Sequence, residues 1–133
     1  MMQFFLFLFG YSHASLKEDE ELTIEQLLNV LLIPSANDAA IVLAEHISGS
    51  VEEFAKLMNK KAEELGCKNT HFVNPNGIHN KNHTSTAYDL ALMGQYAMKN
   101  ETIRKMLVLS NLLCLLLINT IRQTEFLIIL MIY

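Results

Sequence analysis

Apolar and polar positions divide the chain into two apolar ends and a central zone with an ordinary mixture of charges. No Lys, Arg, Asp or Glu occurs between Met1 and Leu16, and only Arg122 and Glu125 are charged between Leu107 and Tyr133. In the centre, apolar residues recur at the spacing of amphipathic helices, with charged residues on the opposite faces. The pattern predicts a mainly helical, soluble centre with unusual termini.

The first two predicted helices flank a proline. Thr23 and Gln26 have capping-box spacing and open a helix over Leu27–Ile33, which is apolar almost all round and is predicted to be buried on every side. Pro34 cannot continue that helix, so the chain must turn before a second helix from about Asp38 to Ile47.

Two further helices have similar signals. Ser50 and Glu53 open a third helix that runs through Leu65, and Gly66 ends it. The segment Thr86–Asp89 repeats the [ST]-x-x-[DE] pattern and begins a fourth helix. Between these helices the sequence predicts a short strand at Thr70–Val73, followed by the turn Asn74-Pro75-Asn76-Gly77.

Composition and charge restrict the possible functions. A chain of 133 residues is one domain or a piece of one, and a net charge of −4 without a basic cluster argues against a nucleic-acid partner. Two cysteines exclude a disulfide framework. Cys67 and His71 with His79 and His83 have a spacing that superficially suggests zinc, but they span a helix end, a strand and a turn. We therefore predict no metal or cofactor, and a packing role for Cys67.

Four motifs occur in order through the central zone: Ser35–Ala40, Gly49-Ser50 leading to Met58-Asn59, Thr70–Gly77 and Ser85–Ala91. Together they resemble the serine-type D-alanyl-D-alanine carboxypeptidases, the low-molecular-mass penicillin-binding proteins. The resemblance covers about Leu16 to Met106. It implies a mainly α fragment of a β-lactamase/transpeptidase-like α+β fold, namely its helical subdomain with a short strand.

The resemblance also implies a mechanism of acyl transfer. In the family, the serine of an S-x-x-K motif attacks the terminal amide of a peptidoglycan stem peptide or a β-lactam, and S-x-N and K-T-G motifs complete the site. Ser35-Ala36-Asn37 matches S-x-N. Ser35 would relay a proton towards the leaving amine and Asn37 would hold the substrate's backbone amide. Ala36, often Gly in such sequences, restricts φ without excluding the turn.

The other two motifs of the family are missing from the chain. No serine is followed by Lys three positions later, and no Lys is followed by Thr-Gly. Because a proton relay without a nucleophile cannot form an acyl-enzyme, we expect the chain to be inactive alone. We interpret it as an internal fragment, in which 16–106 is the partial catalytic domain and 1–15 and 107–133 are apolar, non-family segments. The resemblance implies a location at the extracytoplasmic face of the cell envelope.

Local alternatives remain at the ends and at the motif. The apolar start lacks the basic residue that precedes the apolar run of a secretory signal, and neither apolar run near the end reaches the ~20 residues of a bilayer-spanning helix. As an alternative, the chain is a small membrane-associated binding protein that uses its two apolar ends as anchors. Ser-x-Asn alone also occurs as a helix cap, and Asp38 fits a helix N-terminus, where the dipole favours it.

Overall fold

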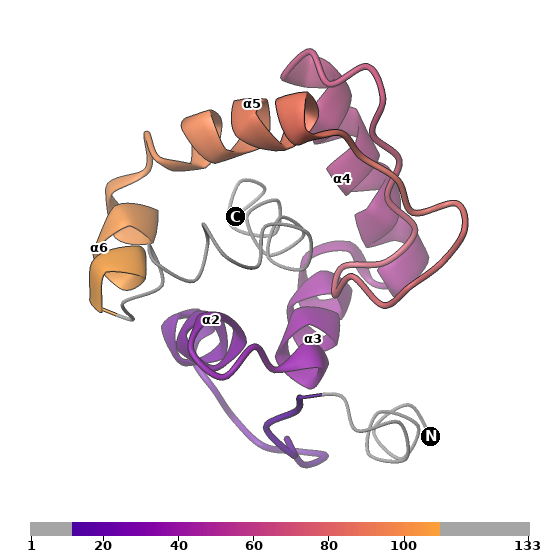
Figure 1. Ribbon diagram of the computed structural model, residues 1–133. Coiled ribbons are helices and arrows are strands. Elements are labelled where there is room, and N and C mark those ends of the chain that lie inside the picture. Colours follow the sequence, from indigo (N-terminus) through magenta and orange to yellow (C-terminus); the bar gives the residue numbers. More distant parts are fainter. Residues whose placement is uncertain (1–11, 110–133) are drawn as a thin grey trace.

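Residues 12–109 are described in the computed structural model of the chain. They form five helices, α2 (Ile24–Leu32), α3 (Asn37–Ser48), α4 (Val51–Glu64), α5 (Ala87–Ala97) and α6 (Glu101–Leu109). The helices follow one another around an open ring, and α6 returns to contact α2 (Figure 1). The mainly helical prediction is confirmed.

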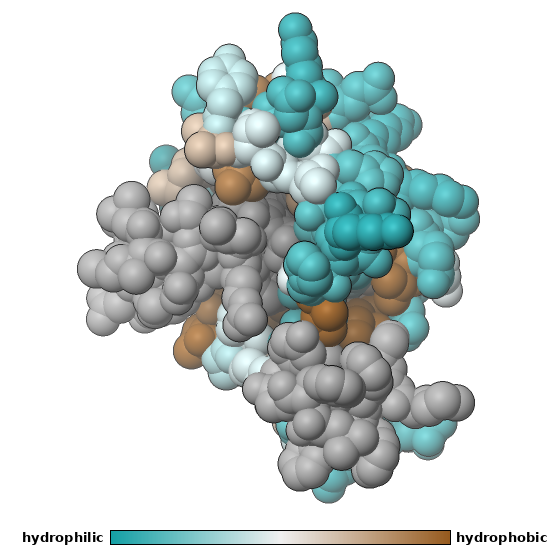
Figure 2. Space-filling view, turned by 45° about the vertical axis from the view of Figure 1, so that its right-hand side comes forward, coloured by the Kyte–Doolittle hydropathy of each residue, from teal (hydrophilic) through white to brown (hydrophobic). Residues whose placement is uncertain are grey.

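The core lies where α3 packs against α2 on one side and α4 on the other. Its large, fully buried side chains come from these helices and from α5 and α6: Leu31, Leu43, Phe54, Met58, Met93 and Ile103. Removing a side chain of this size from water contributes about 1.5–3 kcal/mol, so the apolar faces hold the ring together. Hydrophilic side chains gather instead on the outer face over α4 and the loop that follows it (Figure 2).

The predicted helix starts are confirmed at three of the helices. Thr23 and Gln26 form a complete capping box at α2. The hydroxyls of Ser50 and Thr86 accept hydrogen bonds from the third residue of α4 and α5, respectively. Each such cap satisfies one backbone N–H that has no partner within its own helix.

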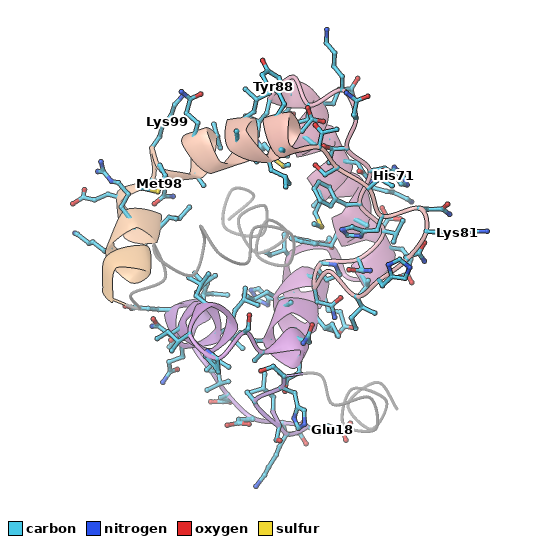
Figure 3. The ribbon with its side chains drawn as sticks, in the orientation of Figure 1. Glu18, His71, Lys81, Tyr88, Met98 and Lys99 are labelled. Atoms are coloured by element: carbon cyan, nitrogen blue, oxygen red, sulfur yellow. The ribbon has the colours of Figure 1, made fainter. Side chains whose placement is uncertain are left out.

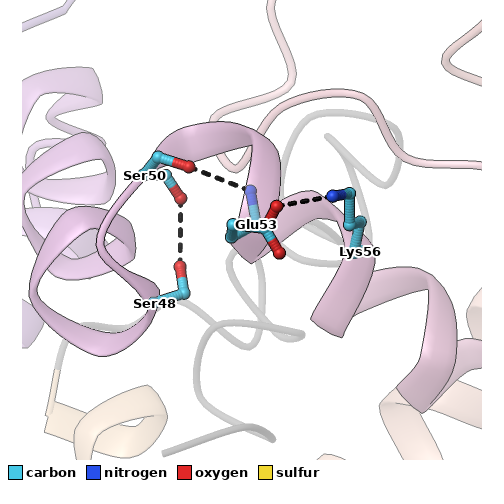
Figure 4. Close-up of polar contacts among 4 residues, drawn as sticks. All are labelled: Ser48, Ser50, Glu53 and Lys56. Carbon is cyan, nitrogen blue, oxygen red and sulfur yellow. Dashed lines mark hydrogen bonds and ion pairs between the residues drawn. The ribbon is translucent and has the colours of Figure 1, made fainter.

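The turn between α3 and α4 is closed by two serines and a glycine. Gly49 ends α3 with φ of 82°, a left-handed conformation that glycine adopts without steric cost. The Ser48 hydroxyl donates to the Ser50 carbonyl at 3.0 Å, and the Ser50 hydroxyl accepts from the Glu53 N–H at 3.1 Å (Figure 4). The Glu53 carboxylate forms an ion pair with Lys56 and does not complete a capping box.

One prediction about α2 is wrong. The helix is buried along one face, through Leu27, Leu28, Leu31 and Leu32, and is not buried on every side. Ile33, just past its end, is 59% exposed. Within the described residues, the main helical contacts of α2 are with α3 and α6.

The predicted strand at Thr70–Val73 reduces to one antiparallel bridge, between His71 and Thr84. The next residue, Phe72, pairs its backbone with a side chain, because the Asn59 amide accepts from the Phe72 N–H and donates to its carbonyl, both at 2.8 Å. An asparagine on α4 thus takes the place of a second strand.

Two further segments complete the described chain. The predicted turn is confirmed, since the Asn74 amide accepts from the Gly77 N–H at 2.7 Å and donates to the Ile78 carbonyl at 2.8 Å. Helix α6 was not predicted from the sequence. Its first turn is capped by the Asn100 side chain, which accepts from the N–H of Thr102 and Ile103.

The structure describes little of the two apolar ends. Residues 1–11 and 110–133, which make up most of the two segments predicted to be non-family sequence or membrane anchors, lie outside the described residues. Among residues 12–109, none of the helices combines the length and the apolar character that crossing a bilayer requires.

Candidate functional site

The Ser35-Ala36-Asn37 motif forms the junction between α2 and α3. Ser35 has φ of 61°, in the left-handed region, which costs a residue with a Cβ about 1–2 kcal/mol. Ala36 has φ of −72°, which any residue adopts, so the restriction that we expected at Ala36 falls on Ser35 instead. Asn37 is the first residue of α3.

The two side chains of the motif differ in their surroundings. Ser35 is half-buried, and its hydroxyl makes no hydrogen bond with another residue in the described part of the chain. Asn37 is buried, and both its backbone N–H and its side-chain Nδ2 donate to the Ser12 carbonyl, at 3.0 and 2.7 Å. The Asn37 amide is therefore fixed in orientation, whereas the Ser35 hydroxyl is not held by another described residue.

Asp38 satisfies the start of α3 in place of a cap. The N-cap residue, Ala36, makes no side-chain hydrogen bond, and the Asp38 carboxylate accepts instead from the Ala39 N–H at 3.1 Å. The same carboxylate accepts from the N–H of Ala14, at 2.9 and 3.1 Å to its two oxygens, and of Leu16, at 3.1 Å.

Residues 12–16, here named the N-terminal strap, are thus held against the motif. Besides the bonds to Asp38 and Asn37, the Ser12 hydroxyl donates to the Pro34 carbonyl. The sequence pattern predicts only a local role for Asp38 at the helix dipole and gives no indication of the strap. Local periodicity gives no signal for it, because the partners lie 22 to 25 positions apart.

A second buried carboxylate, Asp89, forms a fully bonded polar centre at the start of α5. It is 1% exposed and accepts from the Thr70 hydroxyl at 2.7 Å and from the Asn69 N–H at 2.8 Å. The Thr70 hydroxyl above all, with the N–H groups of Asn69 and Lys68 and the Thr86 hydroxyl, holds the pKa of Asp89 below its ordinary value against the opposing effect of burial. These bonds join the loop after α4 to α5, which is a structural role.

The residues that suggested zinc do not form a site. Cys67 is buried in the core, its thiol donates to the Asp89 backbone carbonyl at 3.5 Å, and burial raises its pKa. His71 is exposed on the outer side of the loop (Figure 3), and the His83 ring lies edge-on to Phe72 at 5.3 Å. Across residues 12–109, no three His, Cys, Asp or Glu side chains are grouped closely enough to hold a metal ion.

Comparison with known proteins identifies relatives of this arrangement. The protein family described as D-alanyl-D-alanine carboxypeptidase matches residues 8–122. The D-alanyl-D-alanine carboxypeptidase DacF of Bacillus subtilis is 50% identical over 96 residues, which are 72% of this chain and 25% of that protein. DacA of Haemophilus influenzae is 38% identical over 80 residues, 60% of this chain and 20% of its own length.

Solved structures agree with the sequence matches. A mutant of a Streptomyces DD-transpeptidase has a TM-score of 0.73 and 35% identity, over 78% of this chain and 42% of the other. Penicillin binding protein 6B from Escherichia coli has a TM-score of 0.70 and 34% identity, over 73% and 31%. The chain therefore spans about a quarter of the length of the Bacillus relative and less than half of each of these structures.

Proposed function

Because the chain belongs to the D-alanyl-D-alanine carboxypeptidase family, we propose that residues 16–106 are the helical subdomain of such a catalytic domain and that Ser35-Ala36-Asn37 is its S-x-N motif. The observation that supports the motif most directly is the strained, left-handed Ser35 beside a buried helix start. Ser15 and Asp19 are also left-handed, but both are exposed, whereas Ser35 is half-buried. A conformation that costs free energy at a residue without a hydrogen-bonding partner is typical of functional sites.

In the proposed site, the two polar residues of the motif have one task each. The Ser35 hydroxyl relays a proton towards the amine that leaves when the D-Ala–D-Ala amide of a stem peptide is cleaved. The Asn37 amide holds the substrate's peptide group, and a β-lactam would occupy the same position. The substrate would be met at the extracytoplasmic face of the cell envelope.

The chain alone is proposed to lack activity. The serine that attacks the amide and its activating lysine form an S-x-x-K motif, and the substrate-binding strand contains K-T-G, neither of which occurs in the sequence. Without a nucleophile, the relay and the amide can contribute only one side of a substrate cleft.

Covalent labelling tests the lack of activity. The purified chain is incubated with a fluorescent penicillin, with the Bacillus subtilis relative as positive control. We expect a labelled band for the relative and none for this chain, because no serine here has the activating lysine. A stoichiometric adduct on this chain would overturn the proposal.

A chimera tests the motif itself. The matching segment of the Bacillus relative is replaced by residues 16–106 of this chain, and acylation by the penicillin is timed. Ser35→Ala should slow acylation by about 10²–10⁴-fold, the usual contribution of a positioned proton-transfer group. Ser85→Ala, at an exposed serine, is the matched control and should leave the rate unchanged. Equal rates for the two variants would exclude Ser35 from the reaction.

A further inference from the structure

The N-terminal strap and the Ser35–Asn37 motif are joined by two sets of hydrogen bonds. In one, the motif side donates to the strap, because Asn37 gives both its N–H and its Nδ2 to the Ser12 carbonyl. In the other, the strap donates to α3, because Ala14 and Leu16 give their N–H groups to the Asp38 carboxylate. The strap therefore contacts both residues that follow Ala36.

The Ser12 carbonyl decides which end of the Asn37 amide faces the strap. A carbonyl oxygen only accepts, so it selects Nδ2, and a rotated amide would place two oxygens against each other. With Nδ2 held at 2.7 Å, the Oδ1 atom points away from Ser12. The position of one backbone carbonyl thus sets which hydrogen-bonding atom of Asn37 faces a substrate.

Asp38, together with the bond from the Ser12 hydroxyl to the Pro34 carbonyl, holds the Ser12 carbonyl in place. The strap is otherwise exposed at Ser12, Ala14 and Ser15, and it precedes the first helix of the described chain. Bonds from N–H groups to a carboxylate are roughly twice as strong as neutral ones, and Asp38 is only 5% exposed, so water competes little for it.

We propose that Asp38 is a positioning residue for Asn37, acting through the N-terminal strap; this rests on the proposed function of the Ser35–Asn37 motif. The carboxylate fixes Ala14 and Leu16, these fix Ser12, and the Ser12 carbonyl fixes the amide of Asn37. Asp38 itself is turned towards the strap and does not touch the substrate.

The structural part of the proposal is tested on the full chain with Asp38→Asn, which keeps the shape but replaces one accepting oxygen by a donor group. The N–H groups of Ala14 and Leu16 should exchange with solvent roughly tenfold faster or more, as expected when a bond to a charged group is lost. The side-chain amide signal of Asn37 should shift in the NMR spectrum. Asp19→Asn, at an exposed aspartate in the following segment, is the control with the same change of charge.

A second variant covers the case in which Asp38→Asn does not fold. Ala14→Pro removes the N–H that donates to both Asp38 oxygens and leaves α3 unchanged. It should shift the same Asn37 amide signal. An unchanged Asn37 signal in a folded variant that has lost these bonds would overturn the proposal.

The functional part is tested in the chimera, by separating the rate of acylation from the number of molecules that react. Misplacement of Asn37 slows acylation of every molecule, whereas simple destabilisation lowers the labelled fraction at an unchanged rate. Asp38→Asn should slow the rate, and Asp19→Asn should not. If Ser35→Ala slows acylation and Asp38→Asn does not, or speeds it, this inference fails while the proposed function stands. If neither variant slows acylation, the proposed function fails, and this inference with it.

Discussion

Helices α3 and α5 begin in nearly the same way. Each has a buried aspartate in its first turn, Asp38 or Asp89, and each aspartate accepts backbone N–H groups from a segment about twenty positions earlier in the chain. A serine stands just before the N-cap position in both, Ser35 before α3 and Ser85 before α5. The two starts therefore allow a comparison within one molecule.

The two starts differ in how many of their backbone and hydroxyl groups are hydrogen-bonded. At α5 the Thr86 hydroxyl caps the helix and the Ser85 hydroxyl is bonded to Thr70 at 2.9 Å. At α3 the N-cap residue makes no side-chain bond, and Ser35 is left-handed, without a bonding partner among the described residues. The start of α5 is built for stability, whereas the start of α3 keeps a strained serine, as expected of the functional motif that we propose there.

The largest expected effect comes from truncating a buried side chain in either helix, because α3 and α5 differ at their starts and not in the burial of their bodies. Leu43 on α3 and Met93 on α5 are both fully buried. Truncation of either to alanine should lower the free energy of unfolding by about 2–5 kcal/mol, because each leaves a cavity in the core. We expect Leu43→Ala near the upper end, since α3 is held between α2 and α4 and cannot collapse into the space. Denaturant unfolding measures both; a negligible cost at Met93 would mean that α5 is loosely attached.

The caps should give the next largest difference. Thr86→Ala should cost about 1 kcal/mol, since the Asp89 N–H loses its acceptor. The reciprocal change, Ala36→Ser, should give no gain, because the Asp38 carboxylate already accepts from the Ala39 N–H that a cap would serve. Equilibrium unfolding of the two variants, side by side, checks this. Stabilisation by Ala36→Ser would show that Asp38 does not replace the cap.

Much of this architecture was predictable from local signals. Thr23, Ser50 and Thr86 act on residues three positions away, so spacing alone identified the helix starts. The motif at Ser35 and Asn37 was found from Pro34 and from resemblance, and the structure adds that the left-handed residue is Ser35.

Apart from α6, whose Asn100 cap is local, the missed features are long-range. The bond between Asn59 and the Phe72 backbone, which replaces a strand, connects positions 13 apart, and those from the strap to Asp38 connect positions 22 and 24 apart. Neither follows from periodicity, because one polar side chain on a helix has no pattern that names a distant backbone partner. The burial of α2 on one face, with Ile33 exposed, depended likewise on which neighbours surround it.

Backbone strain should separate the two serines more finely. Ser35→Gly should raise the free energy of unfolding by up to about 1 kcal/mol, because glycine adopts φ of 61° without a Cβ clash, offset in part by its greater freedom when unfolded. Ser85→Gly, at the corresponding position before α5, should not stabilise, since no residue from 84 to 87 has a positive φ. Chemical denaturation compares them. Equal responses would remove the argument that the backbone of Ser35 is strained.

The smallest difference concerns acid. The pKa of Asp89 lies below its ordinary value of 3.8, chiefly because the Thr70 hydroxyl donates to it, so the folded chain binds fewer protons than the unfolded chain in this range. The contribution of Asp89 is complete above that ordinary value and is lost as the pH falls through the lower pKa of the folded state. Thr70→Val removes the main donor and brings the two pKa values closer, so the variant should start less stable at neutral pH but lose less on acidification. Thr102→Val, at an exposed threonine on α6, should retain the original pH dependence. Unfolding measured from neutral pH down to below 3.8 distinguishes them, and parallel curves for all three proteins would mean that the Thr70 hydroxyl does not set the acid response of the α5 start.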